Sequence, residues 1–166
     1  MKFKILFTLF YLLTAAIVHG QNLYQNFDRE NFYSVMSGGR LKEINNELTI
    51  LSSTSIKEKE AYEGALLIRK AGIVKVAAEK LKLFKKGRIK LETALLNDYR
   101  NGEYHFLRLT IQEHAPKVVK YKANIETDKQ YIKDSFANLP TDIQQVIIDY
   151  SKTSNVLHPQ DLKTDD

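Results

Sequence analysis

Apolar residues recur every three or four positions along most of this chain, which is the spacing that gathers them on one face of an α-helix. Between Leu41 and Leu51 the apolar side chains step by three, four and three residues. Ile143, Val146, Ile147 and Tyr150 stand at i, i+3, i+4 and i+7, after a proline of the kind tolerated in a first helical turn. The pattern therefore predicts a chain that is helical throughout.

Polar residues and glycines between the apolar stretches predict where the helices begin and end. Asp28 is a typical helix-capping residue, and Gly38-Gly39 would end the short helix that it begins. Ser55 and Glu58 fit a capping box for a third helix, which Gly72 would end. The predicted helices begin near residues 28, 41, 56, 75, 103, 125 and 140.

The stretch Lys75–Asp98 combines a long apolar face with a run of cations. Its predicted core positions are Val74, Ala77, Ala78, Leu81, Phe84, Leu91, Ala94 and Leu95. The opposite stripe consists of Lys75, Glu79, Lys82, Lys86 and Lys90. Alternation in KLKLF also fits a strand, but over too few residues to outweigh the helical spacing. We therefore expect the lysines to lie where the helix meets water.

A second interpretation of the same lysines is functional. Lys75, Lys82, Lys86 and Lys90 would then meet the phosphates of a lipid or the carboxylates of an acidic protein. Binding of an amphipathic helix to a membrane surface requires a free apolar face, and here that face is assigned to the core. The sequence predicts no stable membrane insertion after removal of the leader.

The first twenty residues are typical of an export signal. Lys2 and Lys4 precede an apolar run from Ile5 to Val18, and Val18-His19-Gly20 predicts cleavage before Gln21. The alternative is an uncleaved anchor, but the run is shorter than the roughly 20 residues that cross a bilayer. The sequence thus predicts a leader at 1–20, a helical domain at 21–153 and a flexible tail at 154–166, with the product in the periplasm or outside the cell.

Composition narrows the class of protein. The chain has 166 residues, enough for one domain, and only 7 Gly and 3 Pro, which suits long helices. It has no Cys, so an exported chain of this kind holds together by its core and not by disulfides, as in many bacterial envelope proteins. The net charge is +5, with two lysines in the leader, which is too small for a nucleic-acid-binding protein.

A partial family resemblance concerns the middle of the chain. Gly87, Leu91 and Ala94 are spaced by four and three residues, and a turn and then Tyr104 follow them. This resembles the junction between two tetratricopeptide repeats, although Tyr99 stands where the repeat usually has Pro and no 34-residue period recurs. The resemblance covers about a quarter of the chain and implies a tetratricopeptide-like hairpin around residues 61–113. Gly within a helix costs about 1 kcal/mol against Ala, so we expect a close helix approach at Gly87.

A looser likeness concerns the whole chain. The leader together with AYEGALLIRKAG and EYHFLRLTIQEHAPK resembles uncharacterised exported helical proteins of two-membrane bacteria. This resemblance implies a location and supplies no reaction. With the periodicity it predicts an all-α bundle of about six or seven antiparallel helices.

Residues able to support catalysis are present but lack catalytic spacing. His105 and His114 are nine positions apart and do not form the metal-binding HExxH pair. There is no GxSxG, SxxK or phosphate-binding loop, and the carboxylates are scattered over faces where they act as solubilising groups. We therefore predict no catalytic site, no metal site and no cofactor.

Tyr104 and Arg108 form one further candidate, because residues four apart share a helix face. They would line a groove for a peptide or carboxylate, or else be a packing tyrosine and a salt-bridged arginine. The expected function is a non-catalytic exported envelope protein that binds a protein or peptide partner. The alternative is a small enzyme or carrier acting on an anionic envelope component through Tyr104, His105, Arg108 and the lysines.

Overall fold

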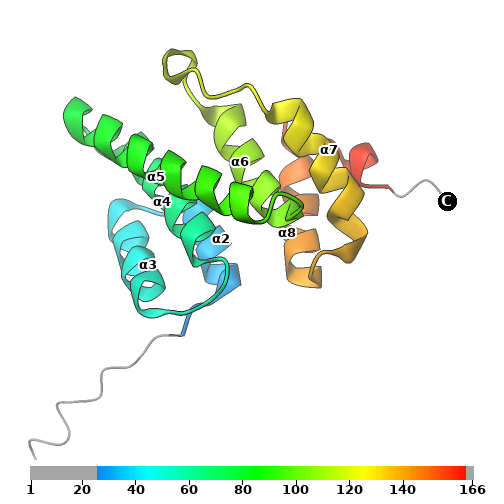
Figure 1. Cartoon of the computed structure of the whole chain (residues 1–166), viewed down its shortest axis with the longest axis horizontal. Coiled ribbons are helices and arrows are strands. Elements are labelled where there is room, and N and C mark those ends of the chain that lie inside the picture. Colours follow the sequence, from blue (N-terminus) through cyan, green and yellow to red (C-terminus); the bar gives the residue numbers. More distant parts are fainter. Residues whose placement is uncertain (1–25, 164–166) are drawn as a thin grey trace, which may run out of the picture.

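The computed structural model describes residues 26–163, and all regular elements in this part of the chain are helical. The predicted all-α class is therefore confirmed (Figure 1). The α-helices are α2 (Arg29–Gly38), α3 (Leu41–Ser53), α4 (Lys59–Ile73), α5 (Ala77–Asn97), α6 (Gly102–His114), α7 (Ile125–Ser135) and α8 (Thr141–Ser151). Short 3-10 helices cover Lys117–Val119, Phe136–Asn138 and Pro159–Leu162.

Helix α4 occupies the centre of the arrangement. It packs along α5 and also contacts α2, α3 and α6, while α7 packs on α6 (Figure 1). Its side chains Ala61, Tyr62, Ala65 and Leu66 are wholly buried, as expected for a helix surrounded by others. Within residues 26–163, no helix combines the length and the apolar character that a membrane span requires.

The helices α4 and α5 approach most closely at two glycines. A Cβ added to Gly87 would lie 2.6 Å from the Gly64 carbonyl oxygen and 2.8 Å from Ile68 Cγ1. A Cβ added to Gly64 would lie 2.7 Å from the Leu91 nitrogen. The close approach predicted at Gly87 is therefore confirmed, and the absence of side chains there lets the two backbones touch.

Some of the predicted helix ends agree with the structure and others do not. Asp28 caps α2 by accepting a hydrogen bond from the Glu30 amide, and α2 ends at Gly38 as predicted. The capping box predicted at Ser55 is wrong, because α4 begins only at Lys59. The amide of residue 56 instead donates to the Thr54 hydroxyl, which holds the chain in a turn.

The end of α4 also differs from the prediction. Gly72 does not end the helix, which continues to Ile73. Val74 follows in an extended conformation and is buried, so the chain leaves the helix there because an apolar side chain turns into the core.

The first half of α5 departs most from the predicted core. Leu91 and Leu95 are buried as expected, but Ala77, Ala78 and Leu81 are exposed, Leu81 by 54%. Only residues 74–76 separate α4 from α5, so the end of α4 lies beside the first turns of α5. Leu81 lies about 120° around α5 from Gly87, which faces α4. Besides α4, α5 contacts mainly α6, so the side of its first turns that carries Leu81 is left open. An apolar face predicted to serve the core is therefore partly open to solvent.

The sequence predicted a flexible tail from residue 154, but in the structure the segment 154–163 packs against the bundle. Leu157 is completely buried, so this segment is anchored on the bundle by an apolar side chain. Glu113 of α6 accepts hydrogen bonds from Ser154 Oγ at 2.7 Å and from the Asn155 amide at 2.7 Å. The rest of the predicted tail, like the predicted leader, lies outside the described residues.

Candidate binding surface

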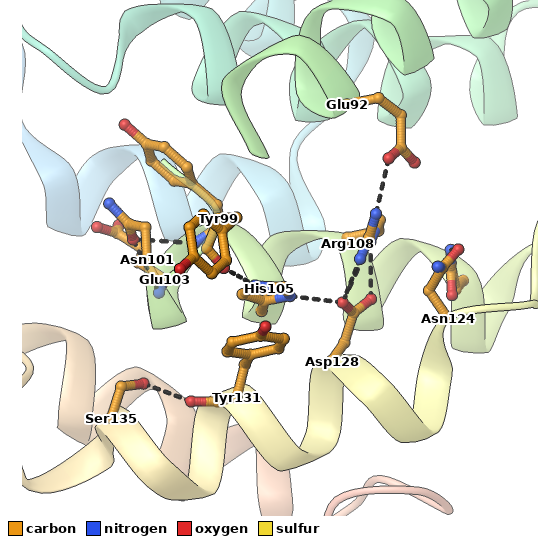
Figure 2. A network of polar contacts seen from close by, with 12 residues as sticks. Glu92, Tyr99, Asn101, Glu103, His105, Arg108, Asn124, Asp128, Tyr131 and Ser135 are labelled. Atoms are coloured by element: carbon orange, nitrogen blue, oxygen red, sulfur yellow. Dashed lines mark hydrogen bonds and ion pairs between the residues drawn. The ribbon is translucent and has the colours of Figure 1, made fainter. Parts of the chain in front are cut away.

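Arg108 and Tyr104, proposed from the sequence as the walls of a groove, are buried inside the protein. Two guanidinium nitrogens of Arg108 donate to Asp128, with Nε 2.9 Å from Oδ2 and Nη2 2.6 Å from Oδ1 (Figure 2). The third guanidinium nitrogen, Nη1, donates to Glu92 at 2.7 Å. Arg108 therefore joins α6 to α7 and α5, in the salt-bridged role that was the second interpretation of this residue.

His105 belongs to the same polar cluster. Its Nδ1 lies 2.6 Å from an Asp128 oxygen and its Nε2 lies 2.7 Å from the Tyr99 carbonyl oxygen. Its ring stacks on Tyr131 with 4.1 Å between the ring centroids (Figure 2). Both ring nitrogens are therefore occupied by groups of the chain itself, so His105 has no free nitrogen for a substrate or a metal.

Tyr104 is held mainly by packing. Its side chain is 3% exposed, and burial, followed by the nearby charge of Glu58, raises the pKa of its phenol to about 12. A phenol with so high a pKa stays protonated at neutral pH. Tyr104 and Arg108 share a helix, as predicted, but the structure does not bring them together at an open groove.

A second buried carboxyl group was not singled out from the sequence. Glu103 accepts hydrogen bonds from the hydroxyls of Tyr62 at 2.6 Å and Tyr33 at 2.8 Å, and Arg29 lies 3.8 Å away. Burial raises the pKa of Glu103, and these hydrogen bonds counteract the rise. The cluster ties α2 and α4 to α6, so its polar atoms serve the fold.

The four candidate lysines, of which Lys75 precedes α5 and the other three lie on it, fall into two groups. Lys90 Nζ lies 2.9 Å from Glu63 and 3.8 Å from Glu60, so its charge is paired with α4. Lys75, Lys82 and Lys86 are exposed and form no ion pair with residues 26–163. The expectation that these lysines lie at the solvent boundary agrees with their exposure.

Exposed apolar side chains concentrate beside these lysines. Seven large apolar residues are exposed in the described part of the chain, and five of them lie between Val76 and Tyr99. Ile89 is 67% exposed and Leu96 is 81% exposed. They are seven positions apart, so both point away from α4 on the same side of α5.

Two cations, Lys82 and Lys85, complete this surface. Lys82, Lys85, Ile89 and Leu96 follow one another by three, four and seven residues and form what we call the α5 outer face. Ile89 and Leu96 were not considered from the sequence. Their exposure could have been predicted, because they lie on the opposite side of the helix from the predicted core residues Leu91 and Leu95.

Comparison with known proteins assigns no family to this chain. No protein-family model, no curated protein and no solved structure matches this chain. Among residues 26–163, no group of three or more His, Cys, Asp or Glu side chains is arranged to hold a metal ion. The function is therefore inferred from the surface of the protein and from the way its buried polar groups are used.

Proposed function

We propose that this chain is an exported, non-catalytic protein that binds a protein or peptide partner through the α5 outer face. The observation that carries the proposal is the concentration of exposed apolar side chains on and next to α5, with Ile89 and Leu96 two turns apart on one face. Apolar patches rimmed by polar residues commonly mark interaction sites. Full burial of each such side chain by a partner contributes roughly 1.5–3 kcal/mol.

The charge of this face restricts the partner. Lys82 and Lys85 lie one to two turns before Ile89 on the same face, and both are exposed. Their methylene stems extend the apolar area, while their ammonium groups favour a partner with carboxylates at the matching end. We therefore expect an acidic amphipathic segment, with its apolar residues over Ile89 and Leu96.

The use of the buried polar groups supports the non-catalytic part of the proposal. The groups with the strongest chemistry, His105, Arg108 and Asp128, are buried, and His105 and Arg108 are both bonded to Asp128. A catalytic acid or base must reach the reacting group of a substrate within about 3 Å or through one water molecule. These side chains satisfy each other instead, which is the behaviour of structural residues.

A capture experiment with the mature chain tests the partner. Immobilised wild-type protein should retain an envelope protein that the Ile89→Gln/Leu96→Gln variant fails to retain, because the two apolar anchors are gone. Leu41→Gln is the matched control, since Leu41 is an exposed apolar residue on α3. Equal retention by wild type and double variant, or equal loss with the control, would refute the proposed face.

Export is tested separately from binding. N-terminal sequencing of the product recovered from the envelope or the medium should give a chain that begins near Gln21. Recovery of the chain with Met1 still present would contradict export by a cleaved signal.

A further inference from the structure

The connection between α6 and α7 presents a second exposed surface with a different composition. Val118, at the tip of this connection, is 85% exposed, the highest value among the large apolar residues of the described chain. Lys117, Lys120 and Lys122 surround it in sequence, and all three are exposed. Lys120 has φ 48°, a left-handed conformation that turns the chain back toward the bundle.

This connection is fixed to the bundle by its next residue. Tyr121 is 3% exposed, and its hydroxyl donates to Glu92 at 2.6 Å. Its ring meets Phe84 edge-on, with 5.7 Å between centroids, and the Arg88 guanidinium carbon lies 4.9 Å from the ring centroid. The connection therefore rests on the flank of α5 that carries Phe84 and Arg88.

The same flank of α5 carries a second exposed apolar side chain. Leu81 precedes Phe84 by three residues and Arg88 by seven, so the three residues share one side of the helix. In Figure 1 the connection and the first half of α5 lie toward the same side of the molecule. We call this surface the basic edge; it comprises Leu81, Arg88, Lys117, Val118, Lys120 and Lys122.

The two acidic residues of α5 nearest the basic edge are turned elsewhere or engaged. Glu79 precedes Leu81 by two residues, so it projects roughly 160° away around α5. Glu92 is engaged by Arg108 at 2.7 Å and by Tyr121 at 2.6 Å. The edge thus combines two exposed apolar side chains with four cations.

We propose that the basic edge docks the protein reversibly on an anionic lipid surface. Val118 projects from a connection and Leu81 from the uncovered part of a helix, so both can enter the interfacial layer of a bilayer without a complementary groove. The cations around them are then placed at the depth of the lipid phosphates. Two small apolar tips and four cations provide weak attachment, which salt reverses.

The proposal goes beyond the proposed function and uses different residues. The basic edge lies about a quarter turn around α5 from Ile89 and Leu96. A protein partner on the α5 outer face and a lipid surface on the basic edge therefore contact separate side chains. Variants of the α5 outer face should therefore lose partner binding and keep lipid binding, and variants of the basic edge should do the reverse.

Co-sedimentation with vesicles tests the proposal. The mature chain should sediment with vesicles of equal parts phosphatidylglycerol and phosphatidylcholine and stay in solution with phosphatidylcholine alone. Each cation near such a surface changes partitioning about fivefold, so Lys117→Gln/Lys120→Asn should lower it about 25-fold. Asn is suited to the left-handed position of Lys120, so the fold should be kept, which circular dichroism checks.

Two further variants make the result specific. Leu81→Gln/Val118→Gln should lower partitioning roughly tenfold, because the apolar tips no longer enter the interface. Lys42→Gln/Lys163→Gln removes the same charge from other exposed positions and should change partitioning less than twofold. Absence of sedimentation, or equal losses in both lysine pairs, would overturn the proposal.

An acidic macromolecule is the competing ligand for such an edge. Polyglutamate added at the same concentration of negative charge should displace little of the vesicle-bound protein, because it offers no interface for Leu81 and Val118. Complete displacement, with no effect of the Leu81→Gln/Val118→Gln change, would show a surface for acidic polymers and overturn the assignment to lipid.

Discussion

The crossing of α4 and α5 allows one prediction to be worked out from atomic positions. Gly64→Ala places a Cβ 2.7 Å from the Leu91 nitrogen and 2.8 Å from the Gly87 oxygen. Carbon normally stays about 3.3 Å or more from such an oxygen, so the helices must separate by about half an ångström. Both neighbours are backbone atoms, so no rotation of a side chain relieves the contact.

The expected magnitude is the balance of two effects. Overpacking a close contact costs typically about 1–3 kcal/mol, and backbone contacts place Gly64 in the upper part of this range. The higher helix propensity of Ala stabilises the folded state by about 1 kcal/mol relative to Gly. Gly64→Ala should therefore lower the free energy of unfolding by about 1–2 kcal/mol, measured by urea titration with circular dichroism at 25 °C.

Gly72 in the same helix is the matched control. A Cβ added there has no heavy atom within 4 Å, so Gly72→Ala should raise the free energy of unfolding by up to about 1 kcal/mol. Opposite signs for the two substitutions support the close crossing. If both substitutions stabilise the protein equally, α4 and α5 do not touch at Gly64 and the packing described above is wrong.

Three other predictions concern side chains. Lys82→Ala/Lys86→Ala should change the free energy of unfolding by less than about 0.5 kcal/mol in a thermal melt, because both lysines are exposed; a large loss would make them structural. Asp128→Ala leaves the buried Arg108 without its main partner and should cost about 3–5 kcal/mol in the same assay, while a near-neutral result would contradict the burial of this pair. Burial raises the pKa of Glu113, but hydrogen bonds from Tyr150, Ser154 and the Asn155 amide outweigh it and set the pKa below the usual 4.5. The stability that ionised Glu113 contributes is therefore present above pH 4.5 and is lost as pH falls further. The stability advantage of wild type over Glu113→Gln should therefore shrink below pH 4.5 in urea titrations, and an advantage that grows there would refute this linkage.

The helical class and most helix positions could be predicted because they depend on local spacing. Ile44 and Leu51 were placed on one face from their seven-residue separation, and both are completely buried. The close approach at Gly87 followed from the cost of glycine in a helix, which a short-range argument can identify. Local rules failed at Ser55, where a turn held by Thr54 replaces the predicted cap.

The extent of the core depends on which sides of each helix are covered by other helices. Leu81 has the periodicity of a core residue, yet it is 54% exposed because it lies on a side of α5 that is turned away from α4. Leu157 shows the opposite case, since it is completely buried within a largely polar segment, where Val156 and Leu162 also pack on the core. Neither outcome is encoded in the spacing of neighbouring residues.

The surroundings of the candidate site residues could not be predicted either, because they depend on residues far away in the sequence. Arg108 and Tyr104 were correctly placed on one helix, but the buried ion pair of Arg108 is with Asp128, twenty positions further along the chain. Pairing at that separation has no signature in a single sequence. The outer lysines were more predictable, because exposure follows from their place opposite the buried stripe of α5.

Site-specific photo-crosslinking in cells tests the central claim most directly, because it reports which residues of the intact protein a partner contacts. A photoreactive amino acid at position 89 or 96 should give a crosslinked adduct of one defined mass on irradiation. The same group at Asn46, an exposed residue of α3, should give none. Absence of an adduct at both α5 positions, or an equal adduct at position 46, would contradict the assignment of the α5 outer face as the binding surface.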